Sequence, residues 1–237
     1  MIPTAEHLDV LFRSGKMKRL GMGTRRACYA IPDTDLCVKC YRSEDEIALG
    51  KHVGHEPFKP LKDAVVREIR RNRFSDSGNT SCQEWRYYNK LKERLSAELA
   101  AAFPDMLERV LVPVRGWCIV ENVIRNFDGS SIHKFHEALK DATLRGDAYR
   151  KGALTAALKC LEDELVRHAV KFYDPQNVMV QWTAGDAFRL RIVDFEPATR
   201  SFIPVDSVLP ALVRCKVRRR FARYRDVFAQ FFEMEGT

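Results

Sequence analysis

The chain lacks any long hydrophobic run. Apolar stretches such as residues 99–103 are far shorter than the roughly 18 to 20 residues that a membrane-spanning helix needs. The N-terminal region carries five charged side chains between Glu6 and Lys18, where a secretory signal peptide has an apolar core. We therefore expect no membrane span, no signal peptide and a cytoplasmic location.

The chain also lacks linkers and repeats. No Gly/Ser-rich or Pro-rich segment divides it, and no sequence period recurs. Its 7 cysteines are an odd and scattered set, which suits reduced, buried thiols better than a disulfide framework. With 237 residues, 46% of them hydrophobic, the chain can bury a core as one bilobed domain or two small ones.

The formal net charge of +8 is concentrated in one segment. Residues 214–225 contain seven lysines and arginines and no acidic residue. Such a segment suits an anionic partner, and a solvated basic helix is the alternative. Because only Phe221 and Tyr224 could stack on bases, binding to RNA or DNA is not favoured.

The first half of the chain has the pattern of a five-stranded sheet. Residues 19–42 predict a three-stranded meander, and residues 43–78 a polar insertion with some helix. From Thr80 to Leu99, apolar residues recur every three or four positions, which predicts one amphipathic helix of about five turns. Two strands within residues 110–123 then complete the sheet.

The second half is predicted to be mainly helical. Residues 147–170 have the apolar spacing of the longest helix. Residues 177–181 and 188–195 form a hairpin, and helices at about 206–217 and 218–233 follow. This element order is that of a protein kinase. We therefore expect an α+β, bilobed protein-kinase-like fold with a five-stranded antiparallel N-lobe (residues 1–123) and a reduced helical C-lobe (residues 124–237).

Two segments of the first half contain residues suited to phosphate binding. The loop with Gly21 and Gly23 lets backbone amides approach phosphate oxygens, and Arg25 and Arg26 can add positive charge. A plain hairpin turn is the alternative, because no third glycine follows. Lys39 lies in an otherwise apolar strand, so it is either a solvent-facing edge residue or the partner of a helical glutamate, as in kinases.

Asn177 and Asp194 are candidate metal ligands. Pro175-Gln176-Asn177 leads into one predicted strand, and Asp194 ends the next apolar strand. Mg²⁺ takes oxygen ligands from about one or two protein groups plus substrate phosphates, and these side chains supply such oxygens.

A set of short motifs is typical of a known family. Together they resemble the bacterial YrbL family, the PhoP regulatory network protein, within the protein-kinase-like superfamily, over about residues 19–225. The motifs are Leu20-Gly21-Met22-Gly23 followed by Cys28-Tyr29, the Val38-Lys39 strand, Glu84 ahead of Tyr87-Tyr88, Phe127-Asp128-Gly129, and Pro175-Gln176-Asn177.

The resemblance implies a nucleotide cleft between two lobes that takes ATP and Mg²⁺. Lys39 and Glu84 would form the ion pair that holds the phosphates, and Asn177 and Asp194 would bind the metal. The backbone from Glu121 to Val123 would contact adenine.

Several positions depart from the kinase pattern. Phe172 stands where the kinase catalytic loop has its aspartate, and the nearest carboxylate is Asp174. Glu196 replaces the glycine of the kinase DFG motif, and the chain after Asp194 is too short for a full activation segment. We therefore do not expect an ordinary protein-substrate kinase.

The sequence leaves two functions open. The first is a minimal atypical kinase-like protein that binds Mg-ATP and transfers phosphate to an unidentified small or anionic acceptor, with Asp174, Lys39 and Glu84 as catalytic residues. The alternative is an inactive pseudokinase that acts as a nucleotide-gated interaction module in a bacterial regulatory circuit.

Overall fold

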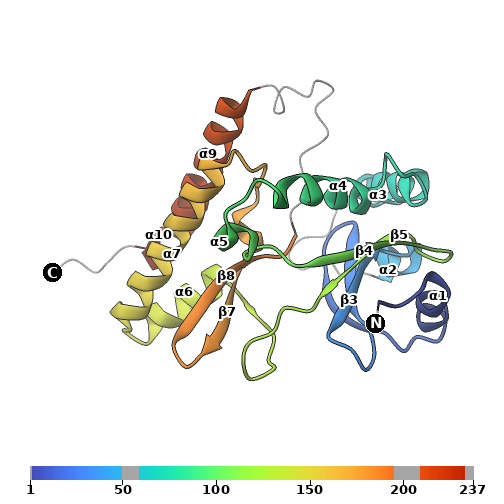
Figure 1. The fold of residues 1–237 in the computed structure, drawn as a ribbon, viewed down its shortest axis with the longest axis horizontal. Coiled ribbons are helices and arrows are strands. Elements are labelled where there is room, and N and C mark those ends of the chain that lie inside the picture. The colour runs from blue at the N-terminus through green and yellow to red at the C-terminus, as the bar shows by residue number, and fades with distance from the viewer. Residues whose placement is uncertain (1, 50–58, 195–208, 233–237) are drawn as a thin grey trace. The chain divides into compact units, whose positions relative to one another are not determined.

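Residues 2–49, 59–194 and 209–232 are described by a computed structural model, in which the chain divides into two units (Figure 1). The first unit contains residues 1–88 and 105–123. The second contains residues 89–104 and 124–237. Each unit is built around its own sheet, so each is described separately.

The first unit contains a five-stranded sheet in which all neighbouring strands are antiparallel. Its strand order is β1-β2-β3-β5-β4, so the sheet predicted from the sequence is confirmed. Pairing β3 with β5 leaves β4 at an edge. The strands are β1 (Lys18–Met22), β2 (Arg26–Ala30), β3 (Leu36–Tyr41), β4 (Met106–Val112) and β5 (Gly116–Asn122).

The two faces of this sheet differ in chemistry because side chains alternate along each strand. On one face Val38, Cys40 and Val120 belong to a buried apolar cluster. The cluster includes Leu8 of helix α1 (Ala5–Arg13), which is fully buried. The intervening residue Lys39 therefore projects from the opposite face, where the candidate site of this unit lies.

The helix predicted from Thr80 to Leu99 is two helices. Helix α4 covers Thr80–Lys92 and α5 covers Ala97–Ala100, so the prediction of one continuous helix is wrong. The side chain of Ser96 accepts a hydrogen bond from the amide of Leu99 and caps α5. A serine that bonds the backbone in this way favours a new helix start over continuation. The polar insertion carries α2 (Glu44–Leu49) and α3 (Lys59–Asn72).

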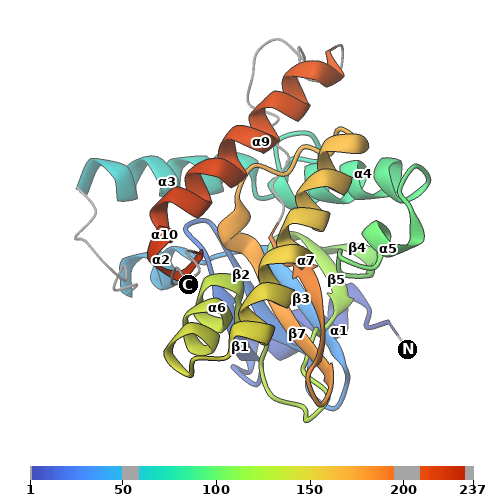
Figure 2. The ribbon, with the colours of Figure 1, turned by 90° about the vertical axis from the view of Figure 1, so that its left-hand side faces the viewer.

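The second unit is mainly helical with a small sheet of order β6-β7-β8. In both views helices α7 and α9 lie side by side (Figures 1 and 2). Across the described ranges no helix is long and apolar enough to cross a membrane. The elements are β6 (His133–Lys134), α6 (Phe135–Leu144), α7 (Ala148–Arg167), a 3₁₀ turn (Pro175–Asn177), β7 (Val178–Ala184), β8 (Ala187–Ile192), α9 (Pro210–Val227) and α10 (Ala229–Phe232).

The basic segment lies in one uninterrupted helix, α9, which corrects the prediction of two helices meeting at residue 217. Val213, Val217, Phe221 and Tyr224 are its buried residues. Their spacing of three or four residues keeps them on one side of the helix, so the apolar stripe continues past residue 217. No glycine or proline interrupts it, and the helix therefore continues.

The backbone of Gly116 offers a test of how β5 is packed. Gly116 has a φ of +77°, and a Cβ built there would lie 2.3 Å from the carbonyl oxygen of Arg73. Gly15 has a φ of +67° but no atom within 4 Å of its Cβ position. Gly116→Ala therefore adds a backbone clash to the left-handed penalty that both substitutions share.

We expect Gly15→Ala to lower the free energy of unfolding by about 1 kcal/mol and Gly116→Ala by on the order of 2 kcal/mol more. Urea unfolding followed by circular dichroism measures both values. Equal losses in the two variants would contradict the close packing of Gly116 against Arg73.

Candidate functional site

The first unit contains a buried ion pair at the centre of its sheet. Lys39 is only 5% exposed, and its Nζ donates to Oε1 of Glu84 at 2.9 Å. Glu84 lies on α4 and is 0% exposed. A charged group that is removed from water needs a charged, hydrogen-bonded partner, which each residue here provides. The pair expected from the sequence is therefore present, and its contact with a nucleotide stays a prediction.

Glu84 also forms an ion pair with Arg26, for which the sequence predicted contact with phosphates. Its Oε2 accepts a hydrogen bond from the buried guanidinium of Arg26. Arg26 was expected to contact phosphates, whereas here it joins β2 to α4 through Glu84. Arg25 pairs with Glu68 at 3.1 Å. A periodicity argument could not find these partners, because it relates residues along one element and not across elements.

The glycine loop is a closed hairpin turn. The amide of Gly23 donates to the carbonyl of Arg26 at 2.8 Å. The buried Arg42 donates to the carbonyls of Gly23 and Thr24, each at 3.3 Å. These bonds hold the loop from within its own unit. Among the described residues, no atom apart from the chain neighbours of Gly21 lies within 4 Å of its Cβ position.

The segment expected to contact adenine makes bonds of its own. The amide of Val123 donates to the carbonyl of Asp35 at 2.8 Å. A hydrogen bond from this amide to a base would have to replace that bond. The Sγ of Cys37 lies 4.0 Å from Oε1 of Glu121, in a weak hydrogen bond. Adenine contact by Glu121 and Val123 therefore stays a prediction.

Sequence reasoning missed a cluster on this face of the sheet. Ligand atoms of Cys28, Cys37 and Glu121 all lie within 4.8 Å of one another. A hydrogen bond with Cys28, together with burial, raises the pKa of the Cys37 thiol, so this thiol is protonated at neutral pH. Two cysteines and a carboxylate could hold zinc only after the two thiols had lost their protons. The cross-strand register brings the three together from β2, β3 and β5.

In the second unit the structure brings together Asp174, Asn177 and Asp194. Asn177 Nδ2 donates to the carbonyl of Asp194 at 2.8 Å and approaches Oδ2 of Asp174 at 3.4 Å. The amide of Val193 donates back to the carbonyl of Asn177 at 3.1 Å. Since Nδ2 is used in these bonds, Oδ1 is the atom that Asn177 can offer to a cation. Asp174 and Asn177 have side-chain oxygens of the kind that Mg²⁺ prefers, and Asp194 is joined to Asn177 through its backbone carbonyl.

Phe172 is a core residue. It is 1% exposed, and its ring packs edge-to-face on Phe221 of α9 with centroids 6.2 Å apart. The ring of Phe172 therefore anchors the loop to the helix. Asp174 is exposed and its Oδ1 accepts from the amide of Gln176 at 3.3 Å, which caps the 3₁₀ turn.

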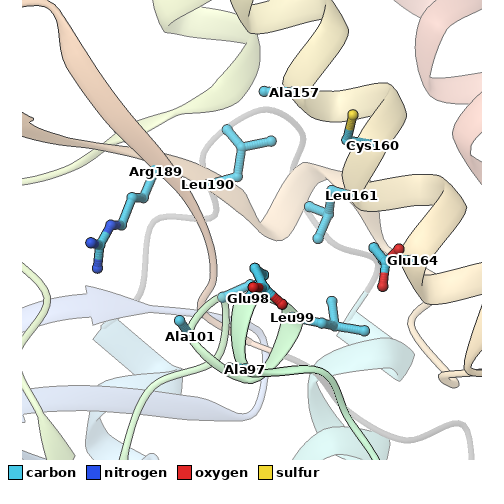
Figure 3. A pocket seen from close by; sticks show the side chains of 11 residues that line it. Ala97, Glu98, Leu99, Ala101, Ala157, Cys160, Leu161, Glu164, Arg189 and Leu190 are labelled. Carbon is cyan, nitrogen blue, oxygen red and sulfur yellow. The ribbon is translucent and has the colours of Figure 1, made fainter.

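Figure 3 shows the larger cavity of the second unit, with a volume of about 520 Å³. It lies among α5, α7 and β8, and its walls are mostly apolar, with Leu99, Leu161 and Leu190 among them. The carboxylates of Glu98 and Glu164 are also at its walls. None of the site residues expected from the sequence lines it, so it is distinct from the Asp174 loop.

These features define an α+β protein with a buried lysine–glutamate pair in its sheet unit and a hydrogen-bonded set of Asp174, Asn177 and Asp194 in its helical unit. A sequence model of the family described as PhoP regulatory network protein YrbL matches residues 15–228. The chain belongs to this family. No curated protein matches the chain.

The Glu84 carboxylate should be necessary for the stability of the first unit. Glu84→Gln keeps the size of the side chain but removes the negative charge that Lys39 and Arg26 share. Removing one member of a buried pair typically costs about 3 to 5 kcal/mol. We expect a loss of this order in the free energy of unfolding, measured by urea denaturation.

Glu44→Gln is the matched control, because its pair with Arg70 is largely exposed on the same unit. An exposed pair is screened by water and salt, so this change should have little effect. Lys39→Met introduced together with Glu84→Gln should recover part of the loss. A Glu84→Gln variant as stable as Glu44→Gln would contradict this account of the buried pair.

Proposed function

We propose that this member of the YrbL family is a kinase-like protein that binds Mg-ATP. The observation that carries the proposal is an ion pair. It joins Lys39, on the third strand of a five-stranded antiparallel sheet, to Glu84 on helix α4. In protein kinases a lysine on this strand, paired with a helical glutamate, contacts the nucleotide phosphates. The chain has the same residue types on the corresponding elements.

The cost of burying this pair supports a functional role. Two buried charges lose their hydration, and well-packed apolar residues in their place are often as stable or more stable. Stability alone therefore gives little reason to bury Lys39, Arg26 and Glu84 together in the sheet. Binding of a ligand with phosphate groups gives such a reason, because the lysine ammonium needs a fixed position to serve as a phosphate contact.

The metal requirement of the proposal is supported in the second unit. Asp194, Asn177 and Asp174 would hold Mg²⁺ through their side-chain oxygens. A bound Mg²⁺ neutralises phosphate charge and orients the transferred group. Asn177 is hydrogen-bonded to the carboxylate of Asp174 and to the backbone carbonyl of Asp194, so the three residues lie close to one another.

Phosphate transfer is the active form of the proposed function, and a pseudokinase is its alternative. The buried ring of Phe172 favours the alternative, because it cannot accept a proton from an acceptor hydroxyl. The nearby carboxylate of Asp174 favours transfer, because it is exposed and belongs to the same loop as Asn177. Catalysis of phosphoryl transfer depends mainly on positioning and charge, so one missing base does not abolish it.

Mg-ATP should raise the melting temperature of the folded protein. At a hundred times its dissociation constant, a ligand stabilises by about 2.7 kcal/mol. Lys39→Met should reduce the shift because it removes a phosphate contact, and Asp194→Asn should reduce the part that depends on Mg²⁺. Differential scanning fluorimetry measures each shift against the ligand-free form of the same variant.

Lys16→Met is the control, since Lys16 is exposed and precedes β1. It should respond to Mg-ATP as the unmodified protein does. Flat responses to ATP, ADP and GTP in the folded, unmodified protein would overturn the nucleotide-binding proposal.

Asp174→Asn should separate the two forms of the proposal. If Asp174 accepts the acceptor proton, its loss should lower phosphate release or transfer from γ-labelled ATP about a hundredfold, the usual scale for a general base. Nucleotide binding should remain. Equal measurable rates in both proteins would exclude this role for Asp174, and ATP binding without turnover in either would indicate a pseudokinase.

A further inference from the structure

A second, smaller pocket of the helical unit lies beside the Asp174 loop. Its volume is about 120 Å³. Pockets that enclose drug-sized ligands start at about 300 Å³, so this one suits a single small group. Its walls come from the loop of residues 173–176 and from α9, including Asp174, Arg220, Arg223 and Tyr224.

Four arginines of α9 differ in their contacts. Arg214 and Arg225 are bound internally: Arg214 donates to the carbonyl of Val166 at 3.1 Å, and Arg225 pairs with Glu162 at 2.6 Å. Arg220 and Arg223 line the pocket instead and are exposed. In the ranges that the structure describes, no ion pair joins either of them to a carboxylate. Two guanidinium groups are therefore available at one small cavity.

Tyr224 also lines this pocket. Tyr224 is 5% exposed, and its hydroxyl is buried without a hydrogen-bond partner among the described residues. A buried donor without an acceptor costs stability, which an oxygen of a bound group could recover.

We infer that this pocket binds the phosphate group of a small phosphate monoester. Arg220 and Arg223 supply guanidinium groups, which match phosphate oxygens in geometry and charge. Tyr224 supplies a neutral donor. The Asp174 carboxylate, at the wall of the pocket, repels the bound phosphate. It can accept a hydrogen bond from a hydroxyl of the same molecule. The ligand is a small phosphorylated alcohol.

This inference deepens the proposed function and rests on it in one respect, the role of the phosphorylated alcohol. In that role the alcohol is the phosphate acceptor, and its hydroxyl lies toward Asp174. The binding itself does not require ATP. It can therefore be measured in the nucleotide-free protein, separately from the kinase-like activity.

The test titrates the full-length protein with glycerol phosphate and with inorganic phosphate at constant ionic strength, by isothermal titration calorimetry. The test variant is the double substitution Arg220→Gln and Arg223→Gln. The matched control is Arg218→Gln with Arg219→Gln, which removes the same charge from the same helix outside the pocket lining. We expect saturable binding that weakens at least tenfold in the test variant and less than twofold in the control.

Tyr224→Phe provides an independent readout. It should weaken phosphate binding severalfold while leaving the melting temperature equal or higher, because it removes a hydroxyl that has no partner. A purely structural tyrosine would leave the phosphate affinity unchanged. Glycerol phosphate binding more tightly than inorganic phosphate supports the alcohol as ligand, whereas the reverse order overturns that assignment.

The outcomes separate this inference from the proposed function. Equal losses of affinity in the two double variants, or no saturable binding to the unmodified protein, would overturn the phosphate site. The melting-temperature shift with Mg-ATP should be unchanged in the Arg220 and Arg223 variant. Saturable phosphate binding in a protein that does not respond to nucleotides would leave the site intact and overturn the kinase-like function.

Discussion

The shared carboxylate of Glu84 is the interaction on which the first unit depends. It accepts from Lys39 on β3 and from Arg26 on β2, so one side chain of α4 connects two strands to a helix. All three residues are buried. Because buried charges are tolerated only when they are paired, the position of α4 and the register of β2 with β3 must be correct together. The opposite face of the same sheet is an apolar core and imposes no such requirement.

The second unit uses charge differently. Its basic helix α9 docks through an apolar stripe on one side, and Phe221 of that stripe packs on Phe172 of the loop that leads to Asp174. This contact holds the loop close to the helix, so Arg220 and Arg223 border the same small pocket as Asp174. Phe172 thus has a structural role, because its ring couples the loop to the helix that carries the positive charge.

Local patterns predicted the elements well where one signal acted alone. Alternation and turn residues were enough for β3 (Leu36–Tyr41), which lies within the meander predicted for residues 19–42. The helix through Leu99 failed because Ser96 bonds the backbone and competes with an apolar period that continues unchanged across it. The opposite error occurred in α9, where a break was predicted although no residue there ends a helix.

By itself the sequence determined the five-stranded sheet and the long helix α7, because both follow from periods along the chain. It also determined the order in which the candidate site residues follow one another from Lys39 to Asp194, because that order follows from motifs. Only the tertiary structure decided that Arg26 joins Glu84, that Cys28, Cys37 and Glu121 converge, and that the amide of Val123 bonds Asp35. The physical reason is that such contacts depend on strand register and helix placement. These arise from burial and pairing between segments far apart in the sequence, which a period along one segment does not encode.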